Sequence, residues 1–220
     1  MEHEFWLERW QNKEIGWHKE NFHSKLVELG KSIFEEGSTI FVPLCGKSKD
    51  MIWLAQQGYK IIGSELSQIA VEEFFAEQNL QPKINQVDGF SCYQNGPYKI
   101  FVGDFFELKA EYIEDCMAWY DRASLIALPE NMRKKYAAKL IQLFRPGSKA
   151  LVISLTYPDG FRNGPPFSVS VDELPKLWPD VEKLEYLCSA ATDLLGRKSQ
   201  HSETASNNNQ VEEHYFELTV

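Results

Sequence analysis

The stretch TIFVPLCGKS at residues 39–48 decides the fold of this chain. Its first half is a short apolar run rich in β-branched and aromatic residues, which predicts a buried strand, and its second half is a turn around Gly46. A helix is predicted from about Ser48 to Gln57, and Gly58 provides its stop signal. A strand, a turn and a helix in this order form the first unit of an alternating α/β pattern.

The same unit recurs directly afterwards. The run YKIIGSE at 59–65 predicts a second strand, and Ser67 is the expected N-cap of a following helix. The other elements predicted up to residue 155 are strands at 91–94, 98–102, 116–120 and 149–155 and a helix at 130–144. Strands that alternate with helices indicate a mainly parallel, doubly wound sheet with helices on both faces.

Both ends of the chain depart from this alternation. Residues 1–35 carry apolar side chains at helical spacing and are expected to form a helical arm. Near the other end, 181–188 and 211–218 predict two strands that pair antiparallel across a polar segment. The length of 220 residues suits one α/β domain, with the arm at 1–35 and a Rossmann-like core at 36–220.

Composition narrows the classes of function. The formal net charge of -9 repels nucleic acid and anionic membranes, so neither is an expected partner. The 4 cysteines form no C-x-x-C pair and the histidines show no ligand-like spacing, so we assign no metal. We see no leader of a basic stretch before an apolar run and no apolar run that could span a bilayer, which makes the cytoplasm the expected location.

Polar residues and a glycine follow the predicted strands where ligands bind in open α/β sheets. Gly46 follows the first strand, Glu65 ends the strand at 59–65, Asp104 follows the strand at 98–102, and Arg122 follows the strand at 116–120. A carboxylate at position 65 can accept hydrogen bonds from both hydroxyls of a ribose. Such a residue is also often a solvated loop carboxylate, and its coincidence with Gly46 and Asp104 favours the binding site.

The first turn is poorly suited to phosphate groups. It has one glycine and lacks G-x-G-x-x-G, which argues against NAD and FAD. A phosphate loop would need glycine at position 41, where the chain has Phe41, so we expect Lys47 to be a solvated lysine at a helix start. A nucleoside without phosphates fits better, and S-adenosylmethionine is such a cofactor.

Several motifs, in order along nearly the whole chain, resemble the bacterial branch of the thiopurine S-methyltransferase family. They are WQ at 10–11, GWH at 16–18, FVPLCGK at 41–47, GSELS at 63–67, FFAEQNL at 74–80, WYDRA at 119–123 and GPPF at 164–167. The resemblance implies the Rossmann-like fold of class I S-adenosylmethionine-dependent methyltransferases, a monomeric protein, and methyl transfer to thiopurines or other aromatic thiols with S-adenosylhomocysteine as product.

The resemblance also implies roles for single residues on the cofactor side. Trp10, Leu44, Glu65 and Arg122 match the family's contacts with S-adenosylmethionine. Glu65 would hold the ribose, and the backbone around Gly46 would face the methionine part. Trp10 would help to close the arm over the cofactor.

Other positions match the adenine and acceptor contacts of the family. Asp104 could accept a hydrogen bond from the exocyclic amine of adenine, and Phe105 could stack on its ring. Trp17 matches an aromatic residue beside the acceptor. Arg197 matches a second arginine on the substrate side, although Lys198 could serve instead.

Each of these residues has a simpler structural interpretation. Trp10 and Phe105 could be core residues, Trp17 could cover the sheet edge, and Arg122 could be the structural partner of Asp121. The family match favours the functional interpretation in each case.

The implied chemistry is the attack of an acceptor thiolate on the methyl group of a sulfonium. Because the cofactor carries the good leaving group, the protein has to align the reacting atoms and exclude water. Arg122 is the expected catalytic residue, with or without Arg197, because a cation favours the thiolate. No covalent intermediate is expected, and the arm and the loop at 162–164 are expected to act as lids.

Alternatives of other classes stay open at this point. The acceptor could be a selenium or tellurium species or a halide, since small soft nucleophiles need little specific recognition. The chain could bind S-adenosylmethionine without catalysis. An NAD-dependent oxidoreductase on a similar sheet is disfavoured by the missing glycine fingerprint.

Overall fold

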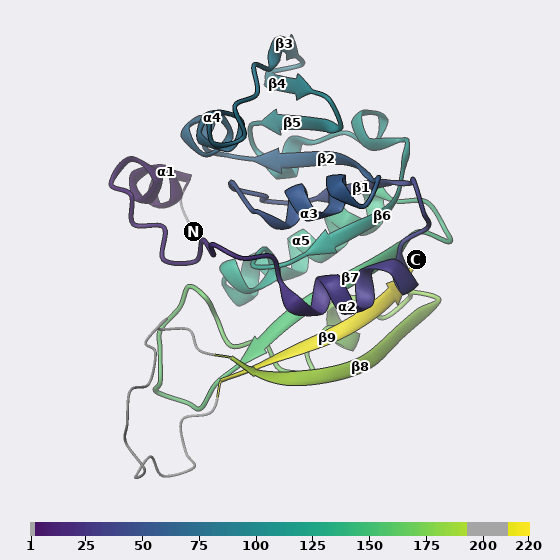
Figure 1. Ribbon diagram of the computed structural model, residues 1–220. Helices are drawn as coiled ribbons and strands as arrows, with labels where there is room; N and C mark the ends of the chain where they lie inside the picture. The colour runs from purple at the N-terminus through teal and green to yellow at the C-terminus, as the bar shows by residue number, and fades with distance from the viewer. Residues whose placement is uncertain (1–2, 193–210) are drawn as a thin grey trace.

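The computed structural model describes residues 3–192 and 211–220, which form one nine-stranded sheet between two layers of helices (Figure 1). Neighbouring strands in the sheet follow the order β3-β4-β5-β2-β1-β6-β7-β9-β8. Their bounds in that order are Lys83–Val87, Phe90–Asn95, Tyr98–Val102, Lys60–Glu65, Thr39–Val42, Cys116–Asp121, Lys149–Thr156, Val211–Thr219 and Lys183–Thr192. The central strands β5, β2, β1, β6 and β7 run parallel, which confirms the predicted doubly wound core.

The two flanks of the sheet are antiparallel. Strands β4 and β5 pair across Gly96 at φ 54°, as the hairpin pattern predicts. Strands β8 and β9 also pair antiparallel, which confirms the predicted C-terminal pair. The edge strand β3 is absent from the sequence prediction, because its residues KINQV are mostly polar and exposed and show no apolar alternation.

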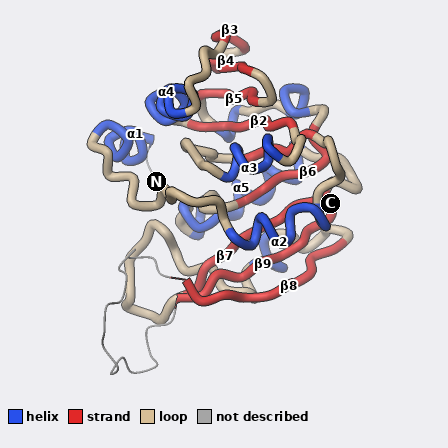
Figure 2. The backbone as a smooth tube through the Cα atoms, in the orientation of Figure 1, coloured by secondary structure: helices blue, strands red, loops and turns tan. Residues whose placement is uncertain are grey.

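Six α-helices accompany these strands among the described residues (Figure 2). They are α1 (His3–Gln11), α2 (Ser24–Ile33), α3 (Asp50–Gln56), α4 (Gln68–Glu77), α5 (Glu130–Leu143) and α6 (Leu174–Leu177). Short 3-10 turns lie at Phe105–Glu107, Ala110–Ile113 and Leu125–Ala127. None of the helices in this part of the chain is long and apolar enough to cross a membrane.

Local sequence explains where two of these helices begin. The hydroxyl of Ser67 accepts a hydrogen bond from the N–H of Ala70, so the predicted N-cap of α4 is confirmed. Helix α3 begins at Asp50 instead of Ser48. The chain makes one more turn first, in which Ser48 N–H donates to the carbonyl of Cys45 and Ser48 Oγ accepts from Asp50 N–H.

The alternation of side chains along the strands divides the core into two halves. Ile40 and Ile61 face the half that contains α2, α3 and α4. Phe41 and Ile62 face the other half, where Tyr136 and other residues of α5 pack. Because both faces of the sheet are covered, its open region is at the strand ends, where the sequence places its polar residues.

The arm has two parts with different positions. Helix α2 packs on the sheet through Leu26 and Ile33, whereas α1 lies beside α4, away from the sheet (Figure 1). Residues 12–23 connect the two helices. Within α1, Trp10 is buried and packs against Gly46 in the loop after β1, so this helix is also fixed to the rest of the molecule.

Candidate functional site

The carboxylate of Glu65 holds together the two loops that follow β1 and β2. One oxygen accepts a hydrogen bond from Gly46 N–H over 2.7 Å, and the other accepts from Ser67 N–H over 2.8 Å. Leu44 and Gly46 both have positive φ, at 45° and 51°, so the chain reverses sharply after β1. The turn is further held by a hydrogen bond from Cys45 N–H to the carbonyl of Ser64.

The environment of Glu65 suits a neutral, hydrogen-bonding ligand. The residue is only 7% exposed, and burial raises the pKa of its carboxyl, while the N–H groups of Ser67, Gly46 and Leu66 act in the opposite direction. Two carboxylate oxygens have about four lone-pair positions, so acceptor capacity remains after these bonds. A phosphate beside this carboxylate would meet like charge, whereas ribose hydroxyls would not.

Lys47 is not the exposed lysine that the sequence led us to expect. Its side chain is 9% exposed, and its ammonium lies 2.7 Å from carboxylate oxygens of both Glu73 and Glu77 on α4. The charge of Lys47 is therefore paired with two partly exposed carboxylates. This arrangement ties the first loop to α4, so Lys47 is not available to a phosphate.

Helix α1 contacts both sides of the region around Glu65. Near its start, His3 Nε2 lies 3.3 Å from an oxygen of Asp104, which follows β5. Near its end, Trp10 packs against Gly46, where a Cβ atom would lie 3.2 Å from the indole ring. Since β2 lies between β5 and β1, the helix extends across the carboxyl end of β2.

An aromatic cluster joins α1 to the connection that follows it. The ring of Trp17 meets those of Trp6 and Trp10 edge-on, with centroids 5.3 and 5.9 Å apart. Trp17 is half-buried, so part of its ring is accessible beside the arm. The structure thus brings Trp10 and Trp17 together.

The two residues expected beside adenine are placed differently. One oxygen of Asp104 accepts a hydrogen bond from Phe106 N–H, and its side chain is partly exposed. Phe105 is 3% exposed and packs in the core against Phe41 and Tyr136. The neighbouring ring of Phe106 is partly buried at the edge of that core.

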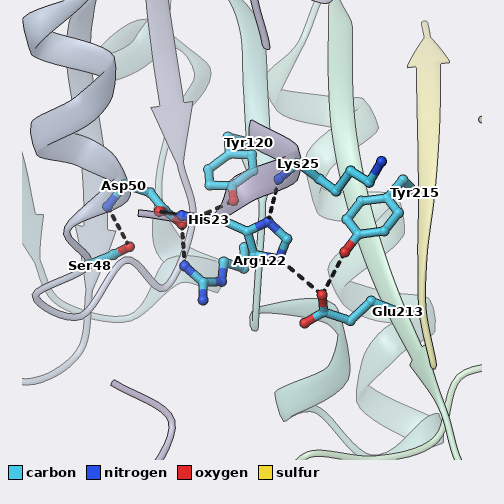
Figure 3. Close-up of polar contacts among 8 residues, drawn as sticks. All are labelled: His23, Lys25, Ser48, Asp50, Tyr120, Arg122, Glu213 and Tyr215. Atoms are coloured by element: carbon cyan, nitrogen blue, oxygen red, sulfur yellow. Dashed lines mark hydrogen bonds and ion pairs between the residues drawn. The ribbon is translucent and has the colours of Figure 1, made fainter. Parts of the chain in front are cut away.

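Arg122 extends from the end of β6 to Asp50 and not to its neighbour Asp121 (Figure 3). Its Nη1 donates to a carboxylate oxygen of Asp50 over 2.6 Å. Burial lowers the pKa of Arg122, but attraction to the carboxylates of Asp50 and Glu213 raises it by more. The guanidinium is therefore a permanent cation. A fifth of its side chain is exposed, which leaves guanidinium surface for a ligand.

Asp121 has a separate, structural set of partners. Tyr136 OH and Leu125 N–H donate to its two oxygens over 2.7 and 3.1 Å. The carboxyl is fully buried, and burial raises its pKa to about 6 against the effect of these hydrogen bonds. Asp121 therefore fixes the turn after β6, from which Arg122 extends.

A second cluster of polar groups lies next to Arg122 (Figure 3). His23 Nε2 lies 3.1 Å from a carboxylate oxygen of Glu213, and Tyr215 OH donates to the same oxygen over 2.6 Å. These hydrogen bonds outweigh burial and lower the pKa of Glu213. Sequence patterns did not identify His23, Asp50 or Glu213, because nothing local to them marks their partners.

The remaining predictions concern the second arginine, metal binding and the cysteines. Arg197 and Lys198 lie outside the described residues. In the part of the chain that is described, no group of three or more His, Cys, Asp or Glu side chains is placed to hold a metal ion. Three of the cysteines, Cys45, Cys92 and Cys116, are free and buried.

Comparisons with known proteins show which family this chain matches. Residues 1–219 match the family described as thiopurine S-methyltransferase. A thiopurine S-methyltransferase of Pseudomonas fluorescens strain Pf-5 is 43% identical over 197 residues, which cover 89% of this chain and 88% of that protein.

Two solved methyltransferase structures have a similar fold. An S-adenosylmethionine-dependent methyltransferase from Anabaena variabilis has a TM-score of 0.63 at 13% identity, covering 99% of this chain and 94% of that one. The 1,6-didemethyltoxoflavin-N1-methyltransferase of Burkholderia thailandensis, solved with S-adenosylhomocysteine, has a TM-score of 0.62 at 11% identity, covering 99% and 87%. These two matches establish the likeness of fold.

Proposed function

Because this chain belongs to the thiopurine S-methyltransferase family and is an S-adenosylmethionine-dependent enzyme, we propose that it methylates aromatic or heterocyclic thiols such as thiopurines. The acceptor class rests on the family match, and the observation that carries the cofactor part of the proposal is the buried Glu65 carboxylate, bonded to Gly46 N–H, at the carboxyl end of β2. When bound, S-adenosylmethionine supplies an activated methyl group on a sulfonium.

We propose that Glu65 binds the ribose. Its carboxylate is already oriented by two backbone N–H groups, so accepting further hydrogen bonds from hydroxyls costs little additional ordering. The pairing of Lys47 with Glu73 and Glu77 supports a ligand without phosphates, because the loop offers no free cation. Leu44 and Gly46 would present backbone groups to the methionine part.

We propose that the adenine lies near Asp104, whose partly exposed carboxylate can accept from an amine. For Phe105, the burial of its ring favours a supporting role beneath the adenine site over direct stacking. Trp10 and the rest of α1 would cover the bound nucleoside as a lid, as the contacts of α1 with Asp104 and Gly46 suggest.

We propose that Arg122 and Trp17 act on the side of the acceptor. A permanent cation near the sulfur favours the thiolate over the thiol, so no strong general base is needed for an acidic thiol. The ring of Trp17 offers an apolar surface to an aromatic acceptor. Arg197 stays a proposed second cation on the substrate side.

The state and location of the protein are part of the proposal. A monomer is expected from the family resemblance, and the cytoplasm agrees with the free, buried cysteines. The net charge of -9 supports the absence of nucleic acid and anionic membranes among the partners.

The test is methyl transfer from labelled S-adenosylmethionine to a panel of thiopurines, thiophenols, selenols, tellurium species and halides. The proposal predicts the highest kcat/KM with aromatic or heterocyclic thiols. Cofactor binding is measured in parallel by calorimetry, with S-adenosylhomocysteine and NAD as the two ligands. Binding without transfer to any acceptor would indicate a non-catalytic protein, and faster turnover of selenium, tellurium or halide acceptors would replace the proposed substrate class.

A further inference from the structure

Asp50 is the point at which three separate parts of the chain meet (Figure 3). It is the first residue of α3, and its side chain is fully buried. One carboxylate oxygen accepts from Arg122 Nη1 over 2.6 Å and from Tyr120 OH over 3.0 Å. The other oxygen accepts from the backbone N–H of His23 over 2.8 Å.

Because Asp50 is buried, breaking its ion pair with Arg122 costs much free energy. A buried carboxylate needs a compensating charge, and removing one partner of a buried ion pair is strongly destabilising. Among the described residues, Arg122 is the only cationic side chain within ion-pair distance of Asp50. The guanidinium is therefore held in one position before any ligand arrives.

A guanidinium held in this way still has donors available. Arginine has five N–H donors in a planar fork, and the ion pair with Asp50 uses Nη1. In Figure 3 the other terminal nitrogen of Arg122 points away from Asp50 and from the other residues drawn. Since a fifth of the side chain is exposed, these donors can meet a ligand without rearrangement.

The same carboxylate connects Arg122 to the N-terminal arm. His23 is the N-cap of α2 and follows the connection that carries Trp17. The backbone N–H of His23 donates to Asp50, and its ring contacts Glu213. His23 therefore attaches the start of α2 to the two carboxylates that lie on either side of Arg122. A substitution at Asp50 would therefore weaken the contacts of both Arg122 and His23.

We infer that Asp50 is a positioning residue, which orients Arg122 for the methyl-transfer reaction. Through its hydrogen bond with His23 N–H, it also couples that orientation to the position of the N-terminal arm. The inference rests on the proposed role of Arg122. It assigns to Asp50 no contact with cofactor or acceptor. Its effect on activity must therefore pass through Arg122.

The experiment is a double-mutant cycle with Asp50→Asn and Arg122→Met. Asp50→Asn keeps the size of the side chain and the acceptor for His23 N–H but removes the charge. The expected result is a fall in kcat/KM of about 10- to 100-fold, as misplacement of a positioning group causes. In the Arg122→Met background, Asp50→Asn is expected to cause no further loss beyond about twofold. An equal loss in both backgrounds would overturn the inference.

The matched control is Tyr120→Phe. It removes a hydrogen bond from the same carboxylate oxygen but leaves the ion pair, so it should lower the unfolding temperature and change kcat/KM by less than about threefold. A fall as large as that of Asp50→Asn would mean that general loosening, and not the position of Arg122, explains the loss.

A crystal structure of Asp50→Asn provides a readout that does not depend on the folding of Arg122→Met. The guanidinium is expected to leave its position at the end of β6. An unchanged Arg122 would contradict the inference even if activity fell. If the wild-type protein neither bound S-adenosylmethionine nor transferred a methyl group, the proposed function would fail, while this structure would still test whether Asp50 positions Arg122.

Discussion

The carboxylate of Glu65 accepts a hydrogen bond from the backbone N–H of Gly46 over 2.7 Å, across two loops that are 19 residues apart in sequence. This bond makes the proposed ribose acceptor part of the structure of the first loop. A substitution at position 65 should therefore affect both ligand binding and stability, and the two effects have to be separated.

Glu65→Ala is expected to weaken binding of S-adenosylmethionine by about 100-fold, because hydrogen bonds to a charged group contribute about 1.5–3 kcal/mol. Calorimetry with S-adenosylmethionine measures the loss. The control is Ser67→Ala, which removes the side-chain cap of α4 but keeps the N–H that binds Glu65. This variant should lose about 1 kcal/mol of stability and keep its affinity. Unchanged binding in Glu65→Ala would disprove the ribose assignment.

Gly46→Ala is expected to displace the arm. The position has φ 51°, and a Cβ atom would lie 3.2 Å from the ring of Trp10, so the substitution adds backbone strain and pushes on the indole. We expect α1 to become more sensitive to protease, and the protection gained on adding S-adenosylhomocysteine to shrink. Gly37→Ala is the control, since it has a positive φ of 74° but no neighbour within 4 Å. Equal digestion of both variants would show that strain alone is responsible.

Lys47→Met separates the proposed site from a phosphate loop. The ammonium is bound by Glu73 and Glu77, so we expect a loss of about 1 kcal/mol of stability and less than about threefold change in cofactor affinity. Thermal denaturation and calorimetry measure the two quantities. A large loss of affinity with unchanged stability would mean that Lys47 contacts the ligand.

Asp121 makes stability depend on pH in a direction opposite to that of an ordinary paired carboxylate. Its pKa in the folded protein is about 6, above the ordinary 3.8, so the folded state binds the proton more tightly. The stability this gives is fully present below about pH 4 and is lost as the pH rises through about 6. A gap of about two pKa units corresponds to about 3 kcal/mol.

The comparison of wild type with Asp121→Asn isolates this effect. Asparagine does not titrate, and the broken hydrogen bond from Tyr136 or Leu125 adds an offset that is the same at every pH. The difference in unfolding free energy, wild type minus variant, should decrease by about 2.4 kcal/mol between pH 4 and 7, which is most of the full effect. Urea denaturation at a series of pH values measures it, and a constant difference would refute the raised pKa.

Much of the fold could be predicted because its signals are local. The apolar run before Gly46, the Ser67 cap and the turn at Gly96 each determine a strand end, a helix start or a hairpin within a few residues. The edge strand β3 escaped prediction because an exposed, polar strand takes its structure from the ladder it joins.

The place of the candidate residues at the strand ends could be predicted from the sequence, whereas their roles stay a proposal. Glu65 ends β2, Gly46 and Asp104 follow β1 and β5, and parallel strands bring their carboxyl ends to one edge. Lys47 was misjudged, because its position next to Gly46 does not reveal the two carboxylates that α4 presents to it.

By itself, the sequence determined the alternation of strands and helices and the residues at the ends of the strands, since backbone preference and side-chain periodicity act over short distances. Only the tertiary structure decided that Arg122 binds Asp50, 72 residues earlier, and that His23 meets Glu213, 190 residues later. Buried charges must find partners wherever the packing of the sheet places them, and that packing depends on the whole chain.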